Sequence, residues 1–211
     1  MSNDPFDTVR SGYDRIAADY LAWSQHSRVR LQQVARLLDE LQPMSTVVEL
    51  GCGAGEPATR LLAERHRVIA IDASRVQLHL ARAAAPDAML LQGDIMRWHL
   101  QPDRVDAVAS FYALGHLPSH AHAGLFERIA TWLRPGGRLL TSAPLTPGDE
   151  TAADWLGVPM FFGGIGERAT REAVRAAGLV IDQWDVIEED EGDGSMVSFG
   201  WLLAHRPSRG R

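Results

Sequence analysis

The stretch that decides the fold is VVELGCGAGEPATRL, which runs from Val47 to Leu61. A short apolar run is followed by three alternating glycines, Gly51, Gly53 and Gly55, and then by a segment with helical spacing. Glycine lets the backbone approach a ligand closely, and a helix that begins after such a loop offers free N–H groups and the positive end of its dipole. The stretch therefore predicts a nucleotide-binding junction. The glycines alone do not identify the nucleotide, because a tight strand-to-helix connection uses the same pattern.

The rest of the chain alternates between helical and strand spacing. Helices are predicted at about residues 28–41, 57–64, 74–85, 124–133 and 168–177. Strands are predicted at 46–50, 68–71, 89–91, 105–111 and 138–143, and a closing hairpin is predicted at 180–187 and 197–205. Such alternation favours a parallel α/β sheet covered by helices on both faces, and the closing pair predicts an antiparallel edge.

The 211 residues are interpreted as a single domain with successive parts. These are an N-terminal helical lid (1–42), a cofactor-binding core (43–143), a substrate-side insertion (144–166) and a C-terminal helix and hairpin (167–206). The insertion interrupts the alternation, so we expect it to be irregular. A long irregular segment in a compact domain is typically a lid or an interface.

Composition excludes several functional classes. The net charge is −6, and all 21 basic residues are arginines, which argues against a large cationic surface for nucleic acid. The single cysteine, Cys52, excludes an intramolecular disulfide and a multi-cysteine zinc site, and it fits a reducing compartment. His120 and His122 flank a predicted helix start and are expected to be solvated, and no three-ligand metal set has convincing spacing. The N-terminus is polar and no apolar run approaches 18 residues, so we expect a cytoplasmic protein without a membrane segment.

Three acidic residues narrow the choice of nucleotide. Asp72 ends the second predicted strand, 19 residues after Gly53, where a carboxylate can accept both ribose hydroxyls. Asp94 ends the third predicted strand, where it could accept a proton from the exocyclic amine of adenine. Glu49 precedes the first glycine, where it would repel a pyrophosphate and suit an ammonium group. These positions lie at the carboxyl ends of strands, where open α/β sheets bind ligands.

The segment Glu49–Gly55, together with Asp72 and Gly93-Asp94-Ile95, resembles the motifs of class I S-adenosylmethionine-dependent methyltransferases of the small-molecule type. Asp106 and the turn Leu133–Gly137 follow in the order and spacing of that family, so the resemblance covers about residues 10–205. It implies a Rossmann-like, mostly parallel seven-stranded sheet with a reversed last strand. It also implies S-adenosylmethionine as cofactor and S-adenosylhomocysteine as product.

The resemblance further implies how the cofactor is held. The methionine end is expected beside Glu49 and the glycine loop, the ribose beside Asp72, and adenine beside Asp94 and Ile95. The full set of expected cofactor contacts is Tyr20, Glu49, Gly51, Cys52, Gly53, Gly55, Asp72, Ala73, Gly93, Asp94, Ile95 and Phe111. Asp106 is expected to serve the strand entry and the edge of the sheet rather than the cofactor, and Cys52 is expected to pack rather than to act as a nucleophile.

The acceptor should meet the methyl group at the end of the fourth predicted strand. Methyl transfer from a sulfonium is an in-line displacement, which needs alignment, and which needs a base only when the acceptor carries a proton. His116 is the candidate base because imidazole titrates near neutrality, and the alternative is that it packs on the cofactor or bonds to backbone. Tyr112 either orients the substrate or packs. The sequence lacks an Asn/Asp-Pro-Pro-Tyr tetrad, which argues against N-methylation of nucleobases and glutamine amides.

Two segments are expected to close the site. The lead-in from Tyr13 to Tyr20 would cover the cofactor, because an aromatic face attracts a sulfonium; alternatively, its tyrosines belong to the apolar stripe of an amphipathic helix. The insertion would roof an apolar acceptor or bury its side chains against a second subunit. The expected substrate contacts are Tyr13, Trp155, Met160, Phe161 and Phe162. The acidic run Glu188–Glu191 predicts a solvated hairpin tip.

The favoured hypothesis is methyl transfer to oxygen or nitrogen of a small, partly apolar metabolite, such as one from bacterial secondary metabolism. A nicotinamide-dependent oxidoreductase is the alternative enzyme, which Glu49, Asp94 and the GxGxG spacing disfavour. A cofactor-binding protein without catalytic activity is the third hypothesis. The expected partner is a small-molecule acceptor, with no nucleic acid and no membrane, in a monomer or a homodimer.

Overall fold

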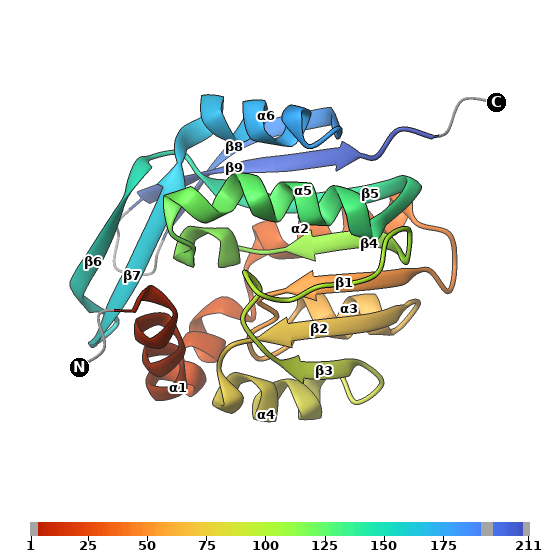
Figure 1. Ribbon diagram of the computed structural model, residues 1–211. Coiled ribbons are helices and arrows are strands. Elements are labelled where there is room, and N and C mark those ends of the chain that lie inside the picture. Colours follow the sequence, from red (N-terminus) through yellow and green to blue (C-terminus); the bar gives the residue numbers. More distant parts are fainter. Residues whose placement is uncertain (1–3, 191–195, 209–211) are drawn as a thin grey trace.

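The computed structural model describes residues 4–190 and 196–208. A seven-stranded sheet forms its centre, in the order β3-β2-β1-β4-β5-β9-β8 (Figure 1). The strands are β1 (Thr46–Leu50), β2 (Arg67–Asp72), β3 (Met89–Gln92), β4 (Val105–Ser110), β5 (Leu133–Pro144), β8 (Val180–Asp190) and β9 (Met196–His205). Strands β1 to β5 are parallel, and β9 runs antiparallel to both β5 and β8.

This topology confirms the predicted sheet with its reversed last strand. The predicted antiparallel edge is confirmed too, because β9 pairs antiparallel with both β5 and β8 at this side of the sheet. The reversed strand β9 lies between β5 and β8, so the outermost strand on that side is β8. The hairpin spacing predicts that β8 and β9 pair with each other. It does not predict which of the two strands pairs with β5.

Helices cover both faces of the sheet. Helices α2 (Arg28–Glu40), α3 (Ala58–Ala63) and α4 (Arg75–Ala84) pack on one face, and α5 (His122–Trp132) and α6 (Gly166–Ala176) pack on the other. Strand β1 contributes apolar side chains to both faces: Val47 packs with Leu37 and Leu62 on the first face, whereas the adjacent Val48 packs with Phe126 on the second. These side chains are fully buried, and each contributes about 1.5–3 kcal/mol of hydrophobic stabilisation.

Capping residues fix the starts of two helices that border the site. Helix α1 (Pro5–Ser24) begins where the carboxylate of Asp4 accepts a hydrogen bond from the backbone N–H of Phe6, with proline in the first turn. Helix α4 begins after Ser74, whose hydroxyl accepts from the N–H of Gln77 at 3.1 Å. The predicted N-cap at Ser74 is therefore confirmed.

The segment after β5 is ordered as a hairpin, which corrects the prediction of an irregular insertion. Strands β6 (Pro147–Trp155) and β7 (Val158–Ile165) pair antiparallel around Leu156 and Gly157, which both have positive φ angles, 51° and 82°. Two successive positive φ angles are typical of the tight type I′ hairpin turn, which usually carries Asn-Gly. The sequence does not predict this hairpin, because its turn contains a leucine and because most side chains of β6 are exposed, so that β6 lacks the alternation of apolar and polar residues.

The β6–β7 hairpin and α1 lie together beyond the carboxyl ends of β1, β2 and β4 (Figure 1). Gly12 allows this close packing, because a Cβ atom there would lie 2.8 Å from Cε of Met160 and 3.2 Å from the carbonyl oxygen of Pro159. Two elements from distant parts of the sequence thus enclose the end of the sheet at which a ligand is expected.

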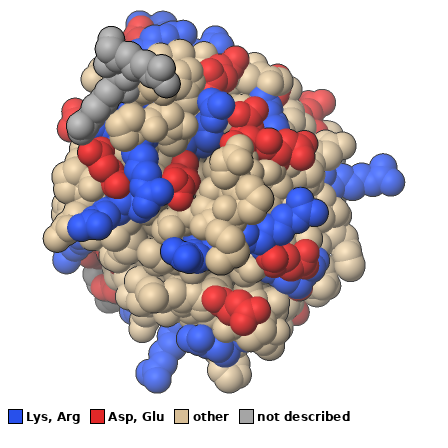
Figure 2. Space-filling view, turned by 90° about the vertical axis from the view of Figure 1, so that its right-hand side faces the viewer, with Lys and Arg blue, Asp and Glu red and all other residues tan. Residues whose placement is uncertain are grey.

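Arginine and carboxylate side chains are interspersed on the face that Figure 2 shows, which is the right-hand side of Figure 1. Ion pairs account for part of this mixture: Arg138, for example, lies 2.8 Å from Glu40 and 3.3 Å from Asp182. Among the described residues, no helix is long and apolar enough to span a membrane. The same residues contain no group of three or more His, Cys, Asp or Glu side chains arranged to hold a metal ion.

Candidate active site

The glycine loop is attached to the end of β2. The backbone N–H groups of Gly51 and Cys52 both donate to the carbonyl oxygen of Ile71, at 2.8 and 3.0 Å, and that of Gly53 donates to Oδ2 of Asp72 at 2.8 Å. Gly51 has φ of 72°, and a Cβ atom there would lie 2.3 Å from Cβ of Ala113, so only glycine fits. Because these amide groups bond within the protein, they are not free to hold a phosphate.

Glu49 lies under the loop with only 2% of its surface exposed. Its Oε2 atom accepts a hydrogen bond from Oγ1 of Thr59 at 2.7 Å, and burial raises the pKa of the carboxyl group to about 7. The structure therefore holds a carboxyl group that changes charge near neutral pH, in a pocket where an ammonium ligand would favour its ionised form.

Asp72 stands at the opposite side of the loop. Its Oδ1 accepts from the backbone N–H of Ser74 at 2.8 Å, and its Oδ2 accepts from Gly53, so both oxygens are oriented by backbone donors. Burial raises the pKa of Asp72 to about 6, and these two backbone bonds act in the opposite direction. Each oxygen keeps a further lone pair for a ligand hydroxyl.

The third acidic position follows β3. The backbone N–H of Gly93 donates to the carbonyl oxygen of Asp72 at 2.9 Å, which brings the ends of β2 and β3 to one pocket. The Oδ1 atom of Asp94 accepts from the N–H of Met96 at 2.8 Å, and the guanidinium of Arg97 lies 3.5 Å from Oδ2. The carboxylate is thus fixed at the rim of the same pocket as Asp72.

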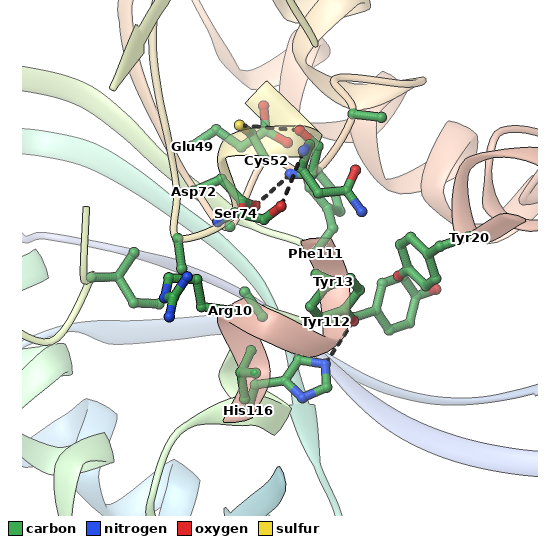
Figure 3. Close-up of a pocket in the computed structure, with 18 of the residues that line it drawn as sticks. Arg10, Tyr13, Tyr20, Glu49, Cys52, Asp72, Ser74, Phe111, Tyr112 and His116 are labelled. Atoms are coloured by element: carbon green, nitrogen blue, oxygen red, sulfur yellow. Dashed lines mark hydrogen bonds between the residues drawn. The ribbon is translucent and has the colours of Figure 1, made fainter. Parts of the chain in front are cut away.

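One pocket collects the predicted cofactor residues (Figure 3). Of those residues, the ones that line it are Tyr20, Glu49, Gly51, Cys52, Gly53, Asp72, Ala73, Gly93, Asp94, Ile95 and Phe111. Gly55 does not line it, because this glycine faces α4, where an added Cβ atom would lie 3.2 Å from Cα of Ala81. Gly55 therefore serves the close packing of the loop on the helix.

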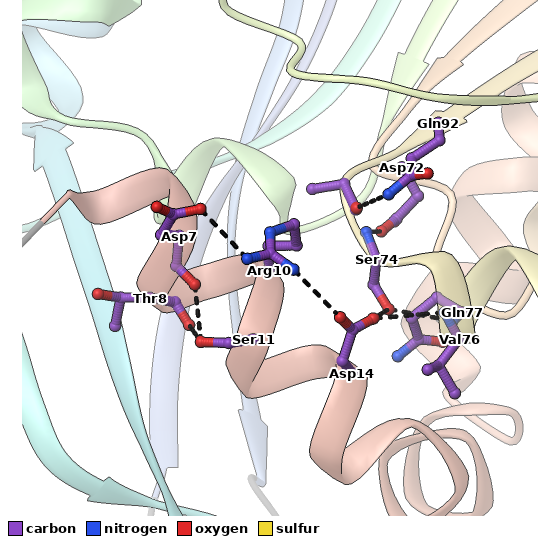
Figure 4. A network of polar contacts seen from close by, with 11 residues as sticks. Asp7, Thr8, Arg10, Ser11, Asp14, Asp72, Ser74, Val76, Gln77 and Gln92 are labelled. Atoms are coloured by element: carbon purple, nitrogen blue, oxygen red, sulfur yellow. Dashed lines mark hydrogen bonds and ion pairs between the residues drawn. The ribbon is translucent and has the colours of Figure 1, made fainter. Parts of the chain in front are cut away.

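Helix α1 covers this pocket and is tied to the start of α4 (Figure 4). The Oδ1 atom of Asp14 accepts from the hydroxyl of Ser74 at 2.6 Å and from the N–H of Val76 at 3.3 Å. Arg10 bridges Asp14 and Asp7 on the helix itself, at 3.5 and 3.2 Å. The connection between α1 and α4 thus lies two residues from Asp72.

A second cavity of about 1020 Å³ adjoins the first. Its walls come from α1, the start of α2, the β6–β7 hairpin and the ends of β8 and β9. The residues that line both spaces are Tyr13, Tyr20, Ser24, Arg30, Tyr112 and His116. We call this shared set the junction, and it contains all three tyrosines of the chain.

The hydrogen bonds of His116 define its tautomer. Its Nδ1 atom lies 2.9 Å from the carbonyl oxygen of Phe161, so Nδ1 carries the proton and donates. Its Nε2 atom lies 2.8 Å from the hydroxyl of Tyr13 and accepts from it. Burial lowers the pKa of His116, and the bond to Phe161 opposes that effect. The imidazole is thus a neutral group whose basic nitrogen is already occupied.

Tyr112 has an unusual backbone for a tyrosine, with φ of 69° and ψ of −10°. A hydrogen bond of 2.7 Å from its N–H to Oγ of Ser142 holds that conformation. Its hydroxyl donates to the carboxylate of Glu189 at 2.6 Å, and burial, followed by the charge of Glu189, raises the pKa of Tyr112. The phenol is therefore a positioned neutral group rather than a base.

Aromatic rings form one wall of the second cavity. The ring of Trp155 lies 5.9 Å from that of Tyr13, 6.0 Å from that of Tyr20 and 5.7 Å from that of Phe162. Of the predicted substrate contacts on the hairpin, Trp155 and Phe162 line the cavity, whereas Met160 and Phe161 are buried and do not line it. Met160 packs with Ile16 and Tyr20 of α1.

Comparisons with known proteins agree with this geometry. Residues 47–137 match the family described as "Methyltransferase domain". Trans-aconitate 2-methyltransferase of Acidovorax sp. (strain JS42) is 35% identical over 126 residues, which are 57% of this chain and 46% of that protein. Residues 47–137 are therefore similar to a methyltransferase domain. Proteins of the same fold have been solved with S-adenosylhomocysteine bound.

Solved structures of methyltransferases show the same fold as this chain. Magnesium protoporphyrin IX methyltransferase from Synechocystis PCC 6803, with bound S-adenosylhomocysteine, has a TM-score of 0.75 at 17% identity, covering 96% of this chain and 100% of that chain. The N1-methyltransferase of 1,6-didemethyltoxoflavin from Burkholderia thailandensis has a TM-score of 0.72 at 20% identity, covering 99% and 92%. The chain spans about half the length of the curated relatives that it matches.

Several other sequence expectations have clear outcomes in the structure. Cys52 is buried and its thiol pKa is raised by burial, which agrees with a packing role. Asp106 accepts from the N–H of Thr46 at 2.7 Å and so serves the start of β1. His122 is fully buried and not solvated, because it lies on the apolar face of α5. Glu189 turns inward to Tyr112, which corrects the solvated interpretation for that residue; Glu191 lies outside the described residues.

Two residues of the first pocket were missed from the sequence. The guanidinium of Arg30 donates to the hydroxyl of Tyr20 at 2.6 Å and stacks on Tyr112, with 4.6 Å from Cζ to the ring centre, and its charge lowers the pKa of the Glu49 and Glu189 carboxyl groups against the effect of burial. Gln77 is 1% exposed, and both polar atoms of its amide lack a partner among the described residues. Because Gln77 lines the pocket, this amide is available to a bound ligand or to water. The only sequence signal was their helical position beside a motif.

Proposed function

We propose that the protein transfers a methyl group from S-adenosylmethionine to oxygen or nitrogen of a small, partly apolar acceptor. The observation that carries the proposal is the junction: the cofactor pocket opens into a second cavity of about 1020 Å³ across six shared residues. A sulfonium methyl group at that opening would face an acceptor held in the second cavity. Such an arrangement supplies the alignment that in-line displacement requires.

The cofactor is placed by charge and hydrogen bonding. Glu49 would pair with the ammonium group of the methionine end, and the guanidinium of Arg30 would take its carboxylate. Asp72 would accept the ribose hydroxyls, and Asp94 with Ile95 would hold adenine. The protein supplies position and electrostatics, while the cofactor supplies the reactive methyl group.

The catalytic contribution of His116 is to position Tyr13. Nε2 of His116 accepts a hydrogen bond from the Tyr13 hydroxyl. The phenol oxygen is therefore left to accept a hydrogen bond from the substrate. Tyr112 would orient the acceptor from the other side of the junction. Helix α1 acts as the lid, and the β6–β7 hairpin forms the substrate side of the site.

A nicotinamide dinucleotide fits the pocket less well. The amide groups of Gly51, Cys52 and Gly53 bond to β2, so they offer no cradle for a pyrophosphate. An ionised Glu49 would repel that group. The names of the curated relatives suggest trans-aconitate as a specific acceptor, and it should therefore be assayed directly.

Binding measurements test the proposal. By calorimetry, S-adenosylhomocysteine should bind and NAD(H) should not, and Asp72→Ala should weaken the binding by about 10- to 100-fold through lost hydrogen bonds to the ribose. Asp39→Ala is the matched control, because Asp39 is exposed on α2 outside the pocket. Transfer of labelled methyl from S-adenosylmethionine to acceptors of a metabolite panel then tests catalysis. Tighter binding of NAD(H), or cofactor binding without transfer to any acceptor, would contradict the proposal.

A further inference from the structure

We infer that the second cavity selects an acceptor with a ring-sized apolar body and a protonated amine. This inference rests on the proposed methyl transfer and adds the chemical class of the acceptor. Four separate observations support it: the hydrogen-bond polarity of the junction, the commitment of Arg30, the charges around the cavity and the aromatic wall.

Two of the three phenol groups of the junction present hydrogen-bond acceptors. The hydroxyl of Tyr13 donates to His116, and the hydroxyl of Tyr112 donates to the carboxylate of Glu189. These two phenol protons are therefore used within the protein, and the two phenol oxygens and the carboxylate remain to accept, whereas Tyr20 accepts from Arg30 and keeps its own proton. A ligand group rich in N–H donors matches this arrangement, whereas a carboxylate would meet lone pairs.

The positive charge of Arg30 does not reverse the preference of the junction for a ligand group rich in N–H donors. Its guanidinium lies over the rings of Tyr20 and Tyr112, with 5.6 and 4.6 Å to the ring centres, and it also lines the cofactor pocket. In the proposed binding mode it is committed to the carboxylate of the cofactor. Arg28, which is exposed, is then the other guanidinium group among the described residues that line the cavity.

The charges around the cavity are predominantly acidic. Asp149 and Glu150 from β6 and Glu188 and Glu189 from β8 line it, against only Arg28 and Arg30 as guanidinium groups. Glu189 is half-buried, and burial raises the pKa of its carboxyl group. Glu188 is exposed at the mouth, where it can attract a cation before binding. His26 is also exposed there, and His116 is neutral within the junction.

The aromatic wall suits both parts of such an acceptor. Trp155, Phe162 and Tyr13 present ring faces and edges that can pack against an apolar body. A cation within about 6 Å of such faces gains further attraction, which is larger in a partly desolvated cavity. Acidic and aromatic groups on one cavity therefore act together on an ammonium group attached to a ring.

Three probes that share an indole ring and a two-carbon side chain test the inference. The side chain ends in a cationic group in tryptamine, a neutral group in tryptophol and an anionic group in indole-3-propionate. Each is titrated into protein saturated with S-adenosylhomocysteine, and affinity is measured by calorimetry. We expect tryptamine to bind at least about tenfold more tightly than the acid, with tryptophol between them. Added salt should narrow the difference, because screening weakens the attraction by carboxylates.

Variants of the acidic residues test whether the cavity wall causes the preference for tryptamine. Glu188→Gln should weaken tryptamine binding by about threefold and leave tryptophol unchanged, and Glu189→Gln should act in the same direction. Glu172→Gln is the matched control, because this exposed carboxylate pairs with Arg168 on α6, away from the cavity. Equal binding of the three probes, tighter binding of the acid, or no binding of tryptamine overturns the inference. Failure of S-adenosylhomocysteine to bind contradicts the proposed function instead.

Discussion

The hydroxyl of Tyr13 lies 2.8 Å from Nε2 of His116, although the two residues come from helix α1 and from the segment after β4. The opposite nitrogen of the ring is held by the carbonyl of Phe161 in β7. Three elements that are distant in the sequence thus share one chain of hydrogen bonds. Helix α1 is therefore connected directly to the side chain that was predicted as the catalytic base.

Tyr13 and His116 should act as one unit. Tyr13→Phe and His116→Ala are each expected to lower kcat by about tenfold, and the double variant should lose no more than either, because each removes the same hydrogen bond. The affinity for S-adenosylhomocysteine should remain nearly unchanged in all three. Because burial keeps His116 neutral, kcat should show no fall near the ordinary pKa of histidine.

The control for this pair is His120→Ala, since His120 is exposed and lies outside both cavities. Independent, multiplicative losses in the double variant would mean that the two side chains do not work through one bond. Unchanged turnover in His116→Ala would mean that orientation of the acceptor is sufficient without this histidine.

Glu49 should make cofactor affinity depend on pH. Its carboxyl pKa is raised from 4.5 to about 7, so in the free protein Glu49 stabilises the fold below about pH 4.5, and this contribution is lost as pH rises through about 7. Pairing with the cofactor ammonium needs the ionised form, so affinity changes in the opposite direction. The Kd for S-adenosylhomocysteine should fall about tenfold between about pH 6 and pH 8.

Two variants test whether Glu49 causes the pH dependence of the affinity. Glu49→Gln should abolish the pH dependence and leave weak binding at every pH. Thr59→Val removes the hydrogen bond that favours the ionised carboxyl group, so it should move the transition to higher pH. A pH dependence that persists in Glu49→Gln would assign the titration to another group.

Gln77→Met should change stability and affinity in opposite directions. Removal of a buried amide without partners is expected to raise the free energy of unfolding of the free protein by about 1 kcal/mol. If the amide bonds the cofactor, the same change should weaken binding of S-adenosylhomocysteine by about tenfold. Denaturant unfolding and calorimetry measure the two effects on the same preparation.

Gln33→Met provides the comparison for this variant. Gln33 is also buried, with an amide oxygen that lacks a partner among the described residues, but it lies on α2 outside the cofactor pocket. It should raise stability without changing affinity. If Gln77→Met lowers stability and leaves affinity intact, the amide has a purely structural role.

Asp14 should control exchange of the cofactor. Asp14→Ala removes the bonds from α1 to Ser74 and Val76, so the lid should open more readily. Stopped-flow fluorescence is expected to show release of S-adenosylhomocysteine accelerated about threefold to tenfold. Asp7→Ala is the control, because Asp7 pairs with Arg10 on α1 and does not reach α4. Equal rates in the two variants would exclude Asp14 as the closing contact.

The sequence predicted the part of the site that local geometry determines. Glu49, Asp72 and Asp94 each end a strand or precede a tight loop, and parallel strands bring such ends to one edge of the sheet. The N-cap at Ser74 was predictable for the same reason, since capping depends on a few neighbouring residues. The order of the strands followed from the family resemblance and from the alternation of elements.

Long-range packing accounts for what the sequence did not predict. Arg30 reaches the junction only because α1 and α2 fold back over the sheet, and its spacing on α2 does not distinguish it from the exposed Arg28. The amide of Gln77 is notable because it is buried, which no local pattern indicates. The β6–β7 hairpin was missed because one of its strands is largely exposed and its turn lacks the usual residues.

The central position of β9 has a consequence for how the chain folds. Residues 138–144 of β5 pair with residues 199–205 of β9, and β8 reaches the sheet only through β9. Although β8 precedes β9 in the sequence, it has no place in the sheet until β9 is paired, so β8 joins the sheet with β9 or after it. Closing such a long loop is slow, and until it closes the edge of β5 is open to strands of other molecules. Aggregation during refolding should therefore begin at β5.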